Sequence, residues 1–211
     1  MTKFLEMMKR TILMVLAVCG IAAAAQTNLR TTGHSVQELV PEGWINIAEA
    51  QGDLNKDGIE DYVIVAAPSE DERPVLAIYW GDVNGFYTLH EAYDSIMPHS
   101  EEEFSMVDLS ISITKRGVLR IDSQLSYSAG STGNERQTHM FRYQDGDFYQ
   151  IGFEIAGYSR YTGESEEQSY NYLTHKCKTT YGNVFQDGYK DKIVWSNLER
   201  EPLKRLGSFE M

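Results

Sequence analysis

Oxygen-bearing side chains occupy alternate positions of the segment 53–61 (DLNKDGIED), and this spacing is typical of a calcium-binding loop. Calcium is a hard cation that takes roughly six to eight oxygen ligands, several of them charged. The loop offers these oxygens at its positions 1, 3, 5, 7 and 9, and the predicted ligands are Asp53, Asn55, Asp57, the backbone carbonyl of Ile59, and Asp61. We therefore expect one metal site with Ca²⁺ as its cofactor.

Gly58 stands at position 6, where the chain must bend sharply to bring the later ligands back to the ion. Position 12 is Ile64, however, where an EF-hand has a bidentate glutamate, so we expect modest affinity. The flanking segments 45–48 and 62–65 are typical of strands, which predicts a calcium loop within a β-hairpin. An ion-free turn is the alternative, because Asp, Asn and Gly are common in all turns.

The elements that position this loop are predicted to be mostly strands. Alternation of apolar and polar residues predicts a hairpin over 106–123, with the turn at Lys115 to Gly117. Two further hairpins are predicted at 75–90 and 140–154, and two more strands at 170–176 and 193–195. Longer loops are expected at 94–105, 128–136 and 159–168.

One short helix is predicted at 35–39, where Ser35 and Glu38 match a capping box. The chain is therefore expected to be mainly β, a single antiparallel β domain of hairpins that forms a sandwich or a partial, propeller-like array. Length allows one domain over 26–211.

The first 25 residues are typical of a signal peptide. Lys3, Lys9 and Arg10 precede an apolar run that ends in three alanines, so cleavage is expected before Gln26 and export to the periplasm or the medium follows. The run of about 15 apolar residues is shorter than the roughly 20 that a membrane-spanning helix needs. A lipoprotein anchored through Cys19 is the less favoured alternative.

Without residues 1–25 the chain has 16 basic and 30 acidic side chains, a formal charge of −14. Such a surface disfavours binding to nucleic acids. Removal of Cys19 leaves Cys177 alone, so no internal disulfide is expected, and Cys177 is predicted to be a buried, inert side chain.

Several segments of the chain resemble one family of exported bacterial proteins. They are 40–44 (VPEGW), the loop 53–61, the hairpin at 76–81, 141–152 (FRYQDGDFYQIG) and 202–206 (PLKRL). The loop itself is similar to those of FG-GAP and VCBS repeats. The family brings no assigned activity, so the resemblance implies an exported, calcium-binding β protein without naming a reaction.

The remaining residues do not specify a reaction. The five histidines form no HxH or HxxxH pair, and His139 near Ser128 and Ser131 lacks a nucleophile elbow. Acidic residues at 101–103 and 164–167 could supply a glycosidase pair. Two hypotheses follow: a non-catalytic calcium-binding module that binds a protein or glycan at the cell envelope, or a secreted hydrolase acting on polysaccharide or peptidoglycan.

Overall fold

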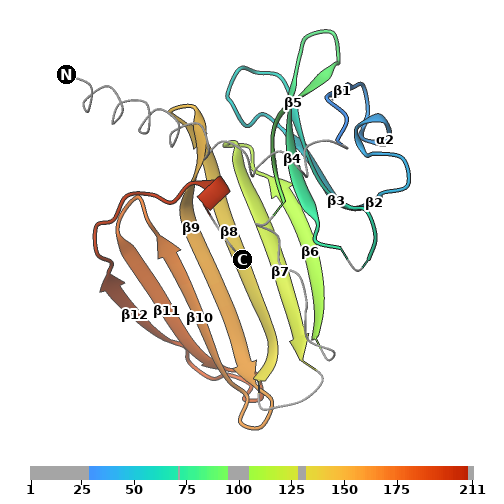
Figure 1. Ribbon diagram of the computed structural model, residues 1–211. Helices are drawn as coiled ribbons and strands as arrows, with labels where there is room; N and C mark the ends of the chain where they lie inside the picture. The colour runs from blue at the N-terminus through green and yellow to red at the C-terminus, as the bar shows by residue number, and fades with distance from the viewer. Residues whose placement is uncertain (1–28, 71, 95–104, 128–131, 209–211) are drawn as a thin grey trace, which may run out of the picture.

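The computed structural model describes residues 29–70, 72–94, 105–127 and 132–208, which form two antiparallel sheets (Figure 1). Sheet A has five strands in the order β1-β5-β4-β3-β2: β1 (Thr32–Gly33), β2 (Ile45–Gly52), β3 (Asp61–Ala67), β4 (Val75–Gly81) and β5 (Tyr87–Tyr93). Sheet B has seven strands in sequence order: β6 (Ser105–Ile113), β7 (Val118–Tyr127), β8 (Thr132–Gln144), β9 (Asp147–Ser159), β10 (Glu164–Asn171), β11 (Lys176–Asn183) and β12 (Lys192–Asn197). Two short helices, α2 (Val36–Leu39) and η1 (Leu206–Ser208), complete the described elements, so the prediction of a mainly β fold is confirmed.

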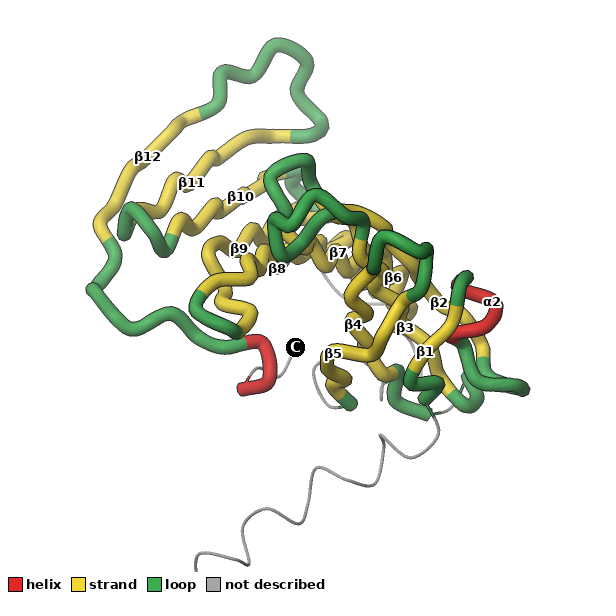
Figure 2. Tube along the Cα trace, turned by 90° about the horizontal axis from the view of Figure 1, so that it is seen from above, coloured by secondary structure: helices red, strands yellow, loops and turns green. Residues whose placement is uncertain are grey.

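Sheet B is curled, and sheet A packs against the inner face of β6 to β9 (Figure 2). The core between the sheets consists of apolar side chains from both of them and from η1. They include Val63, Val65, Leu76 and Ile78 from sheet A, Ile111, Leu119, Ile121, Phe141 and Phe148 from sheet B, and Leu206. Strands β10 to β12 extend beyond sheet A, so sheet A covers only part of the inner face of sheet B.

Within sheet A, β3 and β4 are buried on both faces, which explains why these two strands are apolar without alternation. One face contributes to the core between the sheets. The other face packs against α2 and the segment before it, in a second cluster that holds Leu29, Val36, Leu39, Ile64, Val75, Ala77 and Tyr79. The hydroxyl of Tyr79 donates to the carbonyl oxygen of Arg30 at 3.0 Å, and burial raises the pKa of this hydroxyl to about 12.

The three predicted hairpins are confirmed as β4–β5, β6–β7 and β8–β9. The strand predicted over 170–176 is wrong, because that segment contains the turn between β10 and β11. Asn171 stops the strand by accepting a hydrogen bond from the N–H of Thr174 at 3.0 Å, and His175 adopts a φ of 53°. The alternating residue pattern continues through this turn, so periodicity alone could not reveal it.

Two predicted loops are also shorter than expected. Strand β8 begins at Thr132 and β10 at Glu164, so most of the polar segments 128–136 and 159–168 belongs to strands. The helix at Val36–Leu39 is confirmed, but Ser35 makes no side-chain cap; Glu38 instead accepts a hydrogen bond from the N–H of His34 at 2.9 Å. The predicted signal peptide and most of the segment 94–105 lie outside the described residues.

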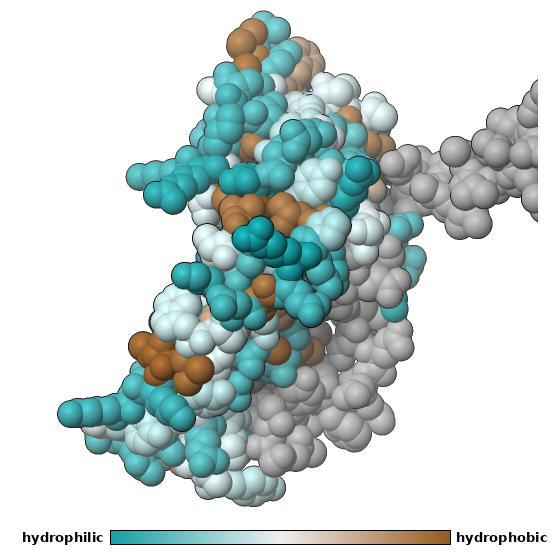
Figure 3. All heavy atoms as spheres, turned by 90° about the vertical axis from the view of Figure 1, so that its left-hand side faces the viewer, coloured by the Kyte–Doolittle hydropathy of each residue, from teal (hydrophilic) through white to brown (hydrophobic). Residues whose placement is uncertain are grey.

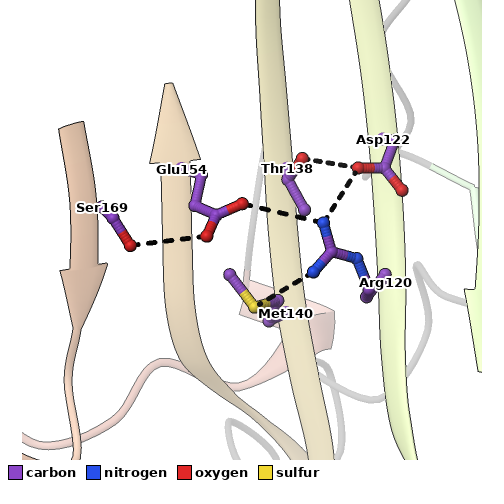
Figure 4. Close-up of polar contacts among 6 residues, drawn as sticks. All are labelled: Arg120, Asp122, Thr138, Met140, Glu154 and Ser169. Carbon is purple, nitrogen blue, oxygen red and sulfur yellow. Dashed lines mark hydrogen bonds and ion pairs between the residues drawn. The ribbon is translucent and has the colours of Figure 1, made fainter. Parts of the chain in front are cut away.

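The outer face of sheet B carries a polar network around Arg120 (Figure 4). Its guanidinium lies 3.5 Å from the carboxylate of Asp122 and 3.7 Å from that of Glu154, and Asp122 also accepts a hydrogen bond from Thr138. The network spans β7 to β10, because Glu154 in turn accepts a hydrogen bond from Ser169. One arginine thus engages both carboxylates, and their arrangement indicates a structural role.

Candidate metal centre

The predicted calcium loop connects β2 to β3, and the paired residues Gly52 and Asp61 close it. This confirms a β-hairpin loop rather than an EF-hand. Gly58 has a φ of 88°, so the glycine predicted at the sharp bend is required there by the backbone. Lys56 also has a positive φ of 66°, a second bend that the spacing of the acidic residues did not indicate. Ile64, at the position of the missing glutamate, is fully buried in sheet A.

Three of the predicted ligands lie close together and are ordered by hydrogen bonds to the loop backbone. The carboxylate of Asp53 accepts from the N–H of Lys56 at 2.7 Å and from the N–H of Gly58 at 3.2 Å. The Asn55 Oδ1 accepts from the N–H of Asp57 at 3.0 Å, and the Asn55 amide donates to the Asp57 carboxylate at 2.9 Å. The side chains of Asp53, Asn55 and Asp57 therefore hold their oxygens on one short stretch of bent backbone.

Asp61 lies beneath the loop, fully buried, and braces it. Its Oδ2 accepts hydrogen bonds from the N–H of Leu54 at 2.8 Å and of Asn55 at 3.4 Å, and its Oδ1 accepts from the N–H of Gly81 at 3.1 Å. Burial raises the pKa of this carboxyl, although the three N–H donors oppose the shift. Asp61 thus fixes the start of the loop and ties it to β4.

The side chains of the loop supply the oxygen ligands that a hard cation prefers. Asp53, Asn55 and Asp57 all offer oxygen ligands, and each carboxylate or amide oxygen has two lone pairs, so one hydrogen bond from an N–H group leaves the second lone pair for an ion. In the described part of the chain, no three Asp, Glu, His or Cys side chains group as metal ligands. The loop brings together the side chains of Asp53, Asn55 and Asp57, and the carboxylate of Asp61 lies beneath them, where it accepts three backbone hydrogen bonds.

The loop rests on the turn between β6 and β7 of sheet B. The Lys56 ammonium donates to the carbonyl oxygen of Lys115 at 3.4 Å, and a Cβ added at Gly117 would lie 2.6 Å from the carbonyl oxygen of Asp53. At the base of the loop, a Cβ at Gly52 would lie 2.8 Å from the side chain of Ile113. Leu54, fully buried in the core, anchors the loop from below. The loop is therefore a contact point between the two sheets.

A second candidate site is the inner face of sheet B beyond the cover of sheet A. A groove of about 620 Å³ lies there, hereafter the inner-face groove, lined by glutamates and tyrosines that include Glu135, Glu164, Glu166, Tyr158, Tyr181 and Tyr189. The strand register places Gly157 between Glu135 and Glu166. Since glycine has no side chain, the two glutamates flank an open gap. The sequence indicated the acidic residues at 164–167 as candidates, but it could not show that Glu135 lies across from Glu166, because strand register joins residues that are far apart in the chain.

His139 is buried beside Phe153 and Phe141 in the inner face of β8. Its Nδ1 accepts a hydrogen bond from the Gln150 amide at 3.0 Å, and burial lowers the pKa of the imidazole to about 4. This environment keeps the ring neutral and packed. The serines considered as its partners, Ser128 and Ser131, lie outside the described residues.

Comparisons with protein-family models, with curated proteins and with solved structures found no match to this chain. Within the described residues, no helix has the length and apolar character needed to cross a membrane.

Proposed function

We propose that the loop 53–61 binds calcium through Asp53, Asn55, Asp57 and the carbonyl of Ile59, and that the chain is an exported, non-catalytic module of the cell envelope. The observation that carries this proposal is the ordering of three oxygen-bearing side chains around Gly58. Asp61 was predicted as the fifth ligand, and its three N–H donors support a role as a brace beneath the ion. The protein partner or glycan that such a module binds stays a prediction.

The ion would stabilise the contact between the sheets. Bound calcium offsets the repulsion between Asp53 and Asp57 and holds the loop against the turn at Gly117. A ligand that binds only the folded state adds about 2.7 kcal/mol at a concentration 100 times its Kd. For a chain of this length, that corresponds to a rise in melting temperature of roughly 5–10 °C.

The test is a thermal melt with increasing calcium, in parallel with magnesium. Asp57→Ala should remove the calcium-dependent rise in melting temperature. Asp82→Ala is the matched control, because Asp82 also accepts backbone hydrogen bonds, from the N–H groups of Asn84 and Phe86, in a turn of the same sheet. Asp82→Ala should keep the full calcium response. An equal response in wild type and Asp57→Ala would exclude this site.

Export is proposed from the leader at residues 1–25. The full chain, expressed in a bacterial host, should appear in the periplasmic or extracellular fraction with Gln26 as its first residue, as N-terminal sequencing would show. Cys19→Ser should change neither the fraction nor the new terminus. Release from the membrane by that substitution would instead support the lipoprotein alternative.

The alternative function is a secreted hydrolase, and the inner-face groove is the observation that favours it. Glu135 and Glu166 stand two strands apart across Gly157, so their backbones are roughly 10 Å apart. Inverting glycosidases separate their carboxyl groups by roughly 6.5–9.5 Å. Release of reducing sugar from cell-wall polysaccharide by wild type, and its loss in Glu166→Gln, would support this function over the non-catalytic module.

A further inference from the structure

Strand β12 forms the outer edge of sheet B, and in the described part of the chain it pairs only with β11. The N–H of Leu198 donates to the carbonyl oxygen of His175, the residue just before β11, at 2.8 Å. The backbone N–H and C=O groups of successive residues point to alternate sides of a strand. Leu198 faces β11, so Ile193 and Trp195, which lie an odd number of residues before it, have backbone groups that point away from β11. No strand among the described residues pairs with these groups, so the edge presents donors and acceptors that can pair with another strand.

The side chains of this edge are apolar and exposed on both faces of the sheet. Ile193 is 52% exposed and Trp195 is 64% exposed on the outer face, while Val194 is 39% exposed on the inner face. Figure 3 views the molecule from the side of β12 and shows hydrophobic patches within a hydrophilic surface. Natural edges are usually protected by charges, proline or a bulge. Within β12 the only charged residue is Lys192, at its first position.

The charges around β12 favour a second copy of this chain as the occupant. Residues 190–192 (KDK) at the start of the strand carry a net charge of +1, and residues 199–201 (ERE) after its end carry a net charge of −1. Antiparallel self-pairing brings the basic end of one strand towards the acidic end of the other. Parallel pairing would place like charges together, so charge complementarity selects the antiparallel arrangement.

We propose that two copies of the chain pair through β12 in an antiparallel register centred on Val194. In a two-fold arrangement this register places Ile193 opposite Trp195 of the partner subunit. Both residues have their backbone groups pointing outward, so the pair exchanges two hydrogen bonds on each side of the axis. The two copies of sheet B then form one continuous sheet. On its outer face, Ile193 of each copy packs against Trp195 of the partner subunit.

The first test measures the molar mass of the exported chain by light scattering over a range of concentrations. Wild type should form dimers, and Ile193→Lys or Trp195→Glu alone should give monomers. The double variant should restore the dimer, because the new ammonium faces the new carboxylate of the partner subunit. Val83→Lys, at a site that is 84% exposed in the turn between β4 and β5 of sheet A, should remain dimeric.

The second test is a register-specific crosslink. Facing residues of a non-hydrogen-bonded antiparallel pair have Cα atoms about 4.5 Å apart, within the range that a disulfide spans. Val194→Cys should therefore form a covalent dimer on oxidation, and Ile193→Cys should not. A chelator should leave both results unchanged, since the calcium loop lies in sheet A, which separates this proposal from the proposed function.

Three outcomes would overturn the proposal. They are a wild-type chain that stays monomeric at all concentrations, a double variant that fails to restore the dimer although its melting curve matches that of wild type, and equal crosslinking at positions 193 and 194. The first would leave the edge to a strand of another protein.

Discussion

The inner face of sheet B differs in composition between its covered and its overhanging part. Where sheet A lies against β7 to β9, the inner side chains are apolar and fully buried, as Leu119 and Phe141 show. Beyond sheet A, the same face carries glutamates, glutamines and tyrosines such as Glu166, Gln168 and Tyr181, and it encloses the inner-face groove. The composition changes where the covering layer ends, although the strands continue in register.

This difference separates a buried apolar region from an exposed polar region within one sheet. Burial of apolar area is the main stabilising contribution, so the covered part holds most of the folding free energy. The overhanging part buries little, and its polar and aromatic side chains remain available to other molecules. Substitutions in the two parts should therefore have very different effects on the free energy of unfolding.

The largest expected effect is that of Phe141→Ala in the covered part. Truncation of a fully buried phenylalanine should lower the free energy of unfolding by about 3–5 kcal/mol, because apolar contacts are lost and a cavity remains. Tyr181→Ala, in the overhanging part, should cost less than about 1 kcal/mol. Urea unfolding of both variants measures the contrast, and similar losses would show that the overhang is part of the cooperative core.

The second effect is a pH dependence of stability that arises from His139, which is buried in the inner face of β8. The pKa of His139 in the folded state is about 4, below the value of 6.5 that it regains on unfolding. Between pH 4 and pH 6.5 the unfolded state therefore binds one more proton than the folded state. The contribution of the neutral His139 ring to stability is complete above pH 6.5 and is lost as the pH falls to 4. The loss should be about 1.4 kcal/mol per pH unit, or about 3 kcal/mol in total.

His139→Gln isolates this contribution, because glutamine is neutral at every pH in that range. The difference in the free energy of unfolding between wild type and His139→Gln should narrow as the pH falls from 6.5 to 4. A constant difference would mean that the buried ring is not the titrating group.

A third, smaller effect tests the contact between the loop 53–61 and sheet B. Gly117 and Gly85 have positive φ values of 68° and 79°, so alanine strains the backbone at both. Only at Gly117 would the new Cβ meet the loop, 2.6 Å from the Asp53 carbonyl oxygen, whereas nothing lies within 4 Å at Gly85. Gly117→Ala should therefore lose about 1–3 kcal/mol more than Gly85→Ala and should weaken the calcium response. Equal melting temperatures for the two variants would mean that the loop 53–61 does not pack tightly against the turn at Gly117.

The sequence predicted local features of this molecule well. Alternation and turn residues located the three hairpins, because a half-buried strand and a tight turn each leave a pattern within about ten residues. The same patterns failed at the turn after Asn171, where alternation continued across it. The loop 53–61 was located by spacing, but the position of Asp61 beneath it depends on the N–H of Gly81, twenty residues further along.

Features that depend on the register between distant strands left no pattern in the sequence. Glu135 and Glu166 approach the same groove only because β8, β9 and β10 align them about Gly157. The extent of sheet A over sheet B likewise follows from packing of the two layers. Sequence periodicity shows that a face is half-buried, but it does not show which other element covers it.

The smallest effect on stability is expected at the far edge of the overhang. Trp195→Ala removes a large side chain that is mostly exposed, so in dilute solution the free energy of unfolding should change by no more than about 0.5 kcal/mol. The melting temperature of wild type should nevertheless rise with protein concentration if β12 pairs with a second copy, since association stabilises the folded state. Trp195→Ala should flatten that concentration dependence while matching wild type at the lowest concentration. A loss above 1 kcal/mol in dilute solution would instead place this tryptophan in the folding core, and the contrast between the covered and the overhanging part of sheet B would not extend to its edge.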